Sequence, residues 1–138
     1  MAAAWAPPRS STAKLSETFR PLAGLRPYAI WNDATARVVN GERMTLATVE
    51  LKPGAVVPEH RHENEQLGFV LQGTLTFTIA GEKRELQAGD AYVIPSNVPH
   101  DVVTGPDGAT VVDVFAPIRS DWEKLPRTDP SPPEWPPS

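Results

Sequence analysis

The chain has 138 residues, of which 40% are hydrophobic and 22% charged, and its formal net charge of −4 suits one ordinary globular domain. With 13 lysines and arginines against 17 acidic residues and no basic run, the composition argues against a protein that binds nucleic acid. The absence of cysteine excludes disulfides, thiol nucleophiles, iron–sulfur clusters and cysteine-ligated zinc.

Residues 1–27 are expected to form an N-terminal arm and lead-in, because the first 20 residues are rich in alanine, serine and proline. The N-terminus lacks the apolar core of a secretory signal. No apolar run in the sequence approaches the ~18 residues that a membrane-spanning helix needs. We therefore expect a cytoplasmic protein that has no membrane partner.

Residues 28–119 form the expected domain, in which short strands alternate with turn signals. In chain order, the expected strands are 36–39, 44–51, 67–71, 74–79, 91–94, 100–104 and 110–115. Turns are expected at Asn40-Gly41, Lys52-Pro53-Gly54, Gln72-Gly73, Ala80-Gly81-Glu82 and Gly105–Gly108. Many short strands with glycine and proline turns indicate an all-β sandwich or barrel.

Residues 120–138 are expected to form a Pro-rich C-terminal tail. Six of the 16 prolines lie in the last 13 residues. Proline lacks an N–H group and fixes φ, so this stretch should be extended rather than helix or central strand. Trp122 and Trp135 are large apolar groups that prefer cover, and they give the tail a means of docking.

The chain has three histidines, His60, His62 and His100. Residues i and i+2 of a strand point the same way, so the first two imidazoles should face one side. Gln66 can re-enter the same space on the next strand, and His100 lies near the start of another. If these strands are neighbours, three imidazoles and one amide oxygen converge on a metal site with open positions.

Two spacings around these histidines resemble the two motifs of the cupin superfamily. They are Gly54-x5-His60-x-His62-x3-Gln66-x6-Gly73 and Gly89-x5-Pro95-x-Asn97-x2-His100. The resemblance implies a single-domain small bacterial cupin, an all-β jelly-roll sandwich or barrel also called a double-stranded β-helix. It further implies one divalent transition metal per chain, held by His60, His62, Gln66 and His100. Nitrogen and oxygen ligands accept Ni, Zn, Fe, Mn or Cu, so the metal stays open.

Three positions depart from the cupin motifs. Gln66 stands where most cupins have glutamate, so the ligands carry no charge and leave the full charge on the ion. Such a site should be a stronger Lewis acid and should favour an anionic small-molecule substrate. Asn97 replaces the usual glycine, and asparagine tolerates the left-handed conformation. Thr104 replaces the asparagine with which the second motif often ends.

A second group of residues, Asp113, Phe115 and Arg119, follows in the last strand. An acid among valines is expected to be partly buried, and a buried acid needs a partner or a function. In the structural interpretation, Asp113 pairs with a backbone N–H or an arginine, Phe115 is core, and Arg119 caps the rim. In the functional interpretation, Asp113 is a general acid or base over the metal, Phe115 walls the substrate, and Arg119 grips a carboxylate.

The run Asp113-x-Phe115-x-Pro117-x-Arg119, with His-x-His-x3-Gln, resembles the small cupins that linearise 4,5-unsaturated monouronates in pectin and alginate breakdown. The resemblance implies that Asp113 and Arg119 are catalytic and that Phe115 and Arg119 bind substrate. It predicts a metal-dependent isomerase of uronate metabolism. Three alternatives stay open: a cupin-type polyketide cyclase, a metal-dependent dioxygenase and a non-catalytic small-molecule binder.

The body of the chain is small for a single core, and the edge strands of a sandwich invite pairing. We therefore expect a homodimer, with the N-terminal arm or the first strand crossing the interface.

Overall fold

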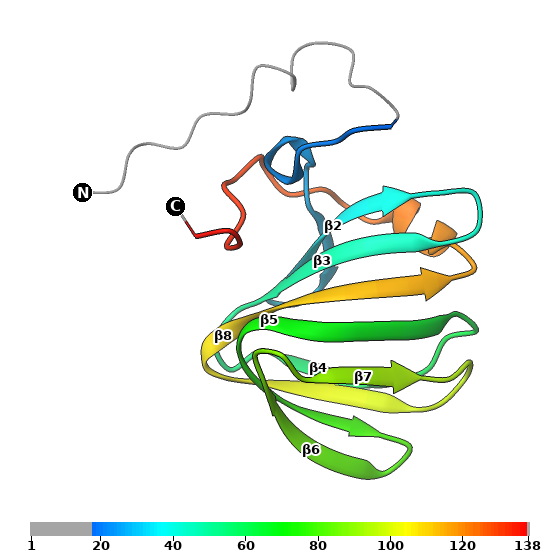
Figure 1. Cartoon of the computed structure of the whole chain (residues 1–138), viewed down its shortest axis with the longest axis vertical. Coiled ribbons are helices and arrows are strands. Elements are labelled where there is room, and N and C mark those ends of the chain that lie inside the picture. Colours follow the sequence, from blue (N-terminus) through cyan, green and yellow to red (C-terminus); the bar gives the residue numbers. More distant parts are fainter. Residues whose placement is uncertain (1–17, 138) are drawn as a thin grey trace.

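The computed structural model describes residues 18–137, in which the regular structure is almost entirely β-strand (Figure 1). Its strands are β1 (Tyr28–Trp31), β2 (Ala34–Asn40), β3 (Thr45–Leu51), β4 (Val56–His60), β5 (Glu65–Ile79), β6 (Glu82–Gln87), β7 (Ala91–Ile94) and β8 (His100–Ala116). Two short 3-10 helices accompany them, η2 (Leu22–Gly24) and η3 (Ser120–Lys124). The predicted all-β class is confirmed. No helix within the described residues is long and apolar enough to cross a membrane.

The two long strands, β5 and β8, pair antiparallel from Glu65↔Ala116 to Ile79↔His100 and run through both layers of the fold (Figure 1). The first half of β5 and the second half of β8 belong to one layer, whose strand order is β1-β2-β3-β8-β5-β7. Their other halves belong to a second layer, in the order β4-β8-β5-β6. The continuous strands therefore join the two layers of a sandwich.

Two of the predicted turns are wrong, because Gln72-Gly73 and Gly105–Gly108 lie inside continuous strands. Where β5 passes between the layers, its register with β8 shifts on both sides of Gly73, which has φ of 80°. A Cβ there would overlap the carbonyl oxygen of Gly108, which has φ of 75°. The two glycines thus allow the backbones of β5 and β8 to bend and to approach each other closely. In the sequence, glycines used in this way inside strands look the same as glycines that form turns.

Other turn predictions are confirmed. Asn40-Gly41 joins β2 to β3, with Asn40 opposite Thr45 and the Gly41 N–H bonded to Met44 O at 2.9 Å. Ala80 and Gly81 connect β5 to β6 with φ of 51° and 80°, the left-handed pair that suits a two-residue hairpin.

The chain after η3 packs against the body of the protein and contains no helix up to residue 137. Its contacts include hydrogen bonds from Ala29 N to Pro126 O at 2.9 Å, from Thr128 N to Pro27 O at 2.9 Å and from Arg37 Nη2 to Ser131 O at 2.7 Å. Arg37 is 1% exposed and also forms an ion pair with Glu50 at 2.6 Å. The tail therefore covers a charge pair on the outer side of β2 and β3.

Gly68 of β5 lies between Tyr92 of β7 and Asp113 of β8 and is opposite both in register. The Tyr92 hydroxyl donates a hydrogen bond of 2.5 Å to Asp113 Oδ1 across this position. A Cβ on Gly68 would overlap Asp113 Oδ1 and lie 2.5 Å from the Tyr92 hydroxyl oxygen. Tyr92 and Asp113 are 8% and 5% exposed, so neither side chain has room to withdraw.

We predict that Gly68→Ala destabilises the protein, because the added methyl group occupies the space of the Tyr92–Asp113 hydrogen bond. Overpacking together with a buried polar group that loses its partner should cost about 2–4 kcal/mol of unfolding free energy, measured by urea denaturation. Gly41→Ala is the matched control, since its nearest neighbour is Met44 O at 3.6 Å and its φ is not left-handed. Equal stability of the two variants would contradict this account of Gly68.

Candidate metal centre

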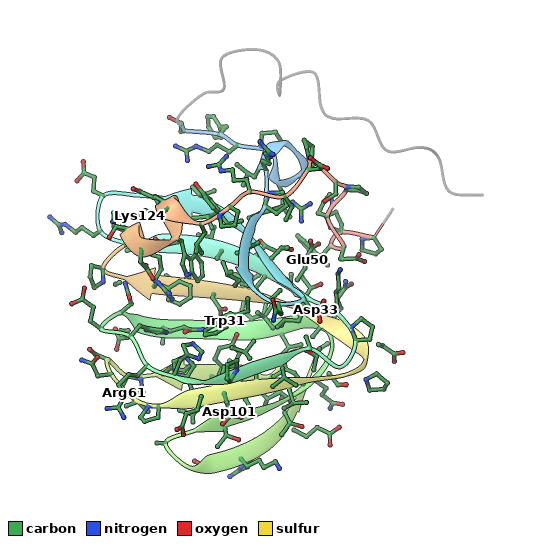
Figure 2. The ribbon with its side chains drawn as sticks, turned by 180° about the vertical axis from the view of Figure 1, so that it is seen from behind. Trp31, Asp33, Glu50, Arg61, Asp101 and Lys124 are labelled. Atoms are coloured by element: carbon green, nitrogen blue, oxygen red, sulfur yellow. The ribbon has the colours of Figure 1, made fainter. Side chains whose placement is uncertain are left out.

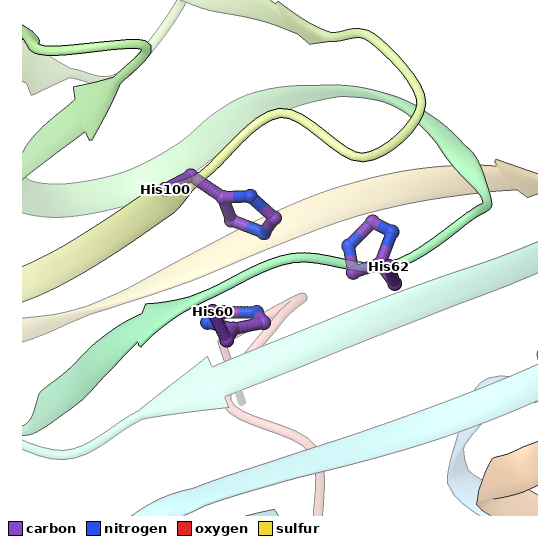
Figure 3. Close-up of side chains that lie close together, drawn as sticks. All are labelled: His60, His62 and His100. Carbon is purple, nitrogen blue, oxygen red and sulfur yellow. The ribbon is translucent and has the colours of Figure 1, made fainter.

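The three histidines come from two neighbouring strands and the loop between β4 and β5. His60 ends β4 and is opposite His100, which begins β8. His62 lies beyond the end of β4, so strand alternation, which we expected to align it with His60, does not apply. The loop nevertheless brings the three rings together, with their ligand atoms within 4.8 Å of one another (Figure 3). The intervening Arg61 is exposed at the periphery (Figure 2).

All three imidazoles are oriented in the same way by the backbone. Each Nδ1 lies 2.9 Å from a carbonyl oxygen: His60 with Pro58, His62 with Asn64 and His100 with Val98. A carbonyl oxygen only accepts, so Nδ1 must carry the proton and donate it. Each neutral ring then keeps its lone pair on Nε2, the nitrogen left for a metal. This is the usual arrangement of histidine ligands, whose other ring nitrogen is held by a hydrogen bond.

Gln66 supplies a fourth donor atom to the same place. Its Oε1 lies 3.1 Å from His62 Nε2. The Gln66 side chain also hydrogen-bonds the Asp113 carboxylate, which accepts, so the amide nitrogen is the group turned toward Asp113. Two acceptors, Oε1 and Nε2, therefore face each other. Their lone pairs repel unless a cation lies between them, and ligands bonded to one ion at ~2.1 Å stand about 3 Å apart. The donor set fits a divalent metal.

Burial lowers the pKa of His60 and of His62, and it lowers the pKa of His100 to about 4, against the opposing hydrogen bonds to the backbone. The rings are therefore neutral at pH 7, as metal ligation requires. Burial has the opposite effect on an acid and raises the pKa of Asp113 to about 6. Hydrogen bonds from Tyr92 and Gln66 and the charge of Arg119 work against that rise.

The donors open into a cavity of about 220 Å³. Besides the histidines and Gln66, its lining includes Trp31, Tyr92, Asp113, Phe115, Arg119, Asp121 and Trp122. Trp31, at the end of β1 (Figure 2), has its ring 5.0 Å from that of His60. The Phe115 ring lies 5.8 Å from the His62 ring, edge to face. All seven residues that the sequence proposed for the site thus meet at one cavity.

Of the lining residues named above, sequence reasoning missed Trp31, Tyr92, Asp121 and Trp122. Tyr92 and Ile94 alternate inward from β7, so the period-2 pattern of that strand could have revealed Tyr92. Trp122 is expected from the sequence only to find cover, and it finds that cover in the cavity wall, packed edge to face on Phe115 with centroids 5.1 Å apart. Asp121 reaches the cavity only because the chain turns into η3 after β8, and no spacing signal marks that turn.

We predict that protein purified without added metal contains about one divalent ion per chain. The His100→Ala variant should lose most of this ion, because it lacks one of the four converging donors. Elemental analysis by mass spectrometry measures both. Arg61→Ala is the control, since this exposed neighbour of two ligands points away from the site and should leave the metal content unchanged. A wild-type protein free of metal would contradict the assignment of these donors.

Comparison with known proteins agrees with the geometry. The family model described as the cupin domain matches residues 47–115, half of the chain. The pectin degradation protein KdgF of Dickeya dadantii is 35% identical over 80 residues, covering 57% of this chain and 73% of that protein.

Two solved structures extend this comparison. KdgF from Halomonas sp. superimposes with a TM-score of 0.64 at 32% identity, over 69% of this chain and 88% of that one. The polyketide cyclase RemF from Streptomyces resistomycificus superimposes with a TM-score of 0.64 at 26% identity, over 72% of this chain and 78% of that one. With the family model, the strand order and the three clustered histidines in agreement, the chain belongs to the cupin family.

Proposed function

We propose that the protein is a metal-dependent enzyme that opens a 4,5-unsaturated monouronate to its linear keto acid. The observation that carries the proposal is the common cavity of the metal donors, a buried carboxylate and an arginine. The similarity to KdgF, whose name places it in pectin degradation, points to a substrate of this class. The cavity of about 220 Å³ suits a single sugar ring, since pockets for drug-sized ligands are about 300–1,000 Å³.

The proposed reaction is an isomerisation, so no atom enters or leaves. The bond between the anomeric carbon and the ring oxygen breaks, the anomeric hydroxyl loses its proton, and the ring oxygen becomes a ketone oxygen. One proton is added to the carbon at the far end of the former double bond. A divalent metal, when held by His60, His62, Gln66 and His100, supplies Lewis-acid polarisation of a substrate oxygen. The remaining work is positioning and proton transfer by side chains.

Each side chain of the cavity has a role in this proposal. Arg119 binds the substrate carboxylate, because its guanidinium is a buried, permanently charged fork that matches a carboxylate. Phe115, 2% exposed beside His62, forms the wall against which the sugar packs. Asp113 takes the proton of the anomeric hydroxyl and supplies the one that is added to carbon, and by accepting from the Gln66 amide nitrogen it turns the amide oxygen toward the histidines.

We predict that Asp113→Asn lowers kcat on a 4,5-unsaturated monouronate by about 10²–10⁴-fold, the usual contribution of a general acid or base. The loss of ultraviolet absorbance of the conjugated double bond measures turnover. Asp107→Asn, an exposed carboxylate on the same strand, should behave as wild type. If Asp113→Asn loses its metal or unfolds, Asp113 only holds Gln66, and the catalytic role is wrong.

A polyketide cyclase is the second candidate, because RemF shares the fold at 26% identity and Trp31, Phe115 and Trp122 make the cavity aromatic. Wild-type protein that holds metal but turns over no unsaturated uronate would favour this reading. Oxygen consumption would instead indicate a dioxygenase. Binding without any turnover would indicate a binding protein.

We propose in addition that two copies pair through the outer face of the layer that contains β3, β8, β5 and β7. One row across these strands is Leu46, Val114, Leu67 and Val93, and the next includes Val112, Phe69 and Ala91. Leu67 and Val93 are 47% and 57% exposed, and neither row contains a charge. An uncharged and mostly apolar face of this kind supports an interface, since it is complementary to a second copy of itself. The N-terminal arm, which we expected at the interface, lies largely outside the described residues.

We predict a homodimer at tens of micromolar by light scattering, and a monomer for Leu67→Glu, because the introduced charge would be buried between two apolar sheets. Val56→Glu is the control, since Val56 is 59% exposed on the other layer, and this variant should stay dimeric. A wild-type monomer would contradict the pairing, and a monomeric Val56→Glu would place the interface on the other layer.

A further inference from the structure

Arg119 already has a carboxylate partner within the chain. Its Nε donates to Asp121 Oδ1 at 3.1 Å and its Nη2 donates to Asp121 Oδ2 at 3.0 Å. This is the two-pronged geometry in which an arginine binds a carboxylate ligand. The Arg119 side chain is 9% exposed, whereas the Asp121 side chain is 63% exposed. Both residues line the cavity that contains the metal donors.

Arg119 does not depend on Asp121 for its position. Its backbone N–H donates to Thr45 Oγ1 at 2.8 Å, which anchors the chain at this point. Its guanidinium carbon lies 4.8 Å from the centroid of Phe115 and 4.2 Å from that of Trp122, so the charge rests on two aromatic rings. Phe115 and Trp122 are themselves buried. Stacking on the two rings and the backbone hydrogen bond thus position the arginine. Asp121 contributes a negative charge and is not needed to fix the position of the guanidinium.

We infer that Asp121 is a specificity-determining residue, an internal carboxylate with which any carboxylate ligand must compete for Arg119. The inference rests on the proposed function in one respect, that the ligand's carboxylate binds this arginine. Asp121 occupies two of the five guanidinium N–H groups. An incoming carboxylate must displace it or share the guanidinium with it, and two negative charges a few ångströms apart repel. Either course weakens the binding of the anion.

The competition has a selective consequence. A tethered group acts at an effective concentration in the millimolar range, so a simple carboxylate at lower concentration does not displace Asp121. A sugar acid whose hydroxyl oxygens would also coordinate a divalent metal held by these donors gains a second point of attachment and overcomes the competition. Asp121 therefore favours ligands that reach both Arg119 and the metal centre over ligands that carry a carboxylate alone.

The test is isothermal titration calorimetry of the metal-loaded protein with D-galacturonate and with its uncharged methyl ester. Asp121→Asn should bind D-galacturonate about 3–5-fold more tightly than wild type, the effect of one partly exposed ion pair. Its affinity for the methyl ester should be unchanged. Glu123→Gln is the matched control, because it removes the same charge two residues away in η3 without lining the cavity, and it should bind like wild type.

Three results would overturn the inference. Weaker binding of D-galacturonate by Asp121→Asn would mean that Asp121 holds Arg119 in place. Equal affinity of Asp121→Asn and wild type for D-galacturonate would mean that Asp121 does not compete measurably for Arg119. An Asp121→Asn variant that binds D-galacturonate no better than the methyl ester would mean that Arg119 does not recognise the carboxylate. If calorimetry gives the expected affinities but the wild-type protein turns over no unsaturated uronate, the proposed function is refuted and the role of Asp121 stands.

Discussion

The antiparallel pairing of β5 with β8 is the constraint on which the rest of the structure depends. The two strands stay together over 15 and 17 residues while passing from one layer of the sandwich to the other. Both layers are therefore built on the same pair, and the interior between them is lined from both strands. Gln66 of β5 and His100 and Asp113 of β8 enter that interior, and β4 adds His60 by pairing with the start of β8. The site is a consequence of this pairing.

A buried polar chain then sets the direction of each donor. The Tyr92 hydroxyl donates to Asp113, Asp113 accepts from the Gln66 amide, and the Gln66 oxygen faces His62. The first two links satisfy buried polar groups, as burial requires, whereas the third leaves two acceptors facing each other where a cation would lie. Gly68 makes the first link possible, since no side chain fits between Tyr92 and Asp113. A small residue on a central strand thereby controls the orientation of a metal donor.

The charges of the site are arranged around a set of uncharged donors. Three neutral imidazoles and an amide would leave the charge of a bound divalent ion uncompensated, and Arg119 adds a positive charge at the same cavity. Asp113 lies buried beneath Gln66, and Asp121 lies exposed against Arg119. In the proposed function the first acid acts on Gln66 and on protons, and in the further inference the second acts on the recognition of anions. This balance suits a small anionic ligand.

The sequence by itself determined the all-β class and named the candidate metal donors and the second group that the structure brings to one cavity, because the cupin motif spacing is a local property of the chain. It failed at Gly73 and Gly108, where glycines that looked like turns bend two continuous strands, since a left-handed φ serves either purpose. Only the tertiary structure decided that His62 reaches the site from a loop, that Tyr92 partners Asp113, and that Asp121 pairs with Arg119. Those contacts depend on how strands register and where the chain turns after β8, which no spacing along the sequence specifies.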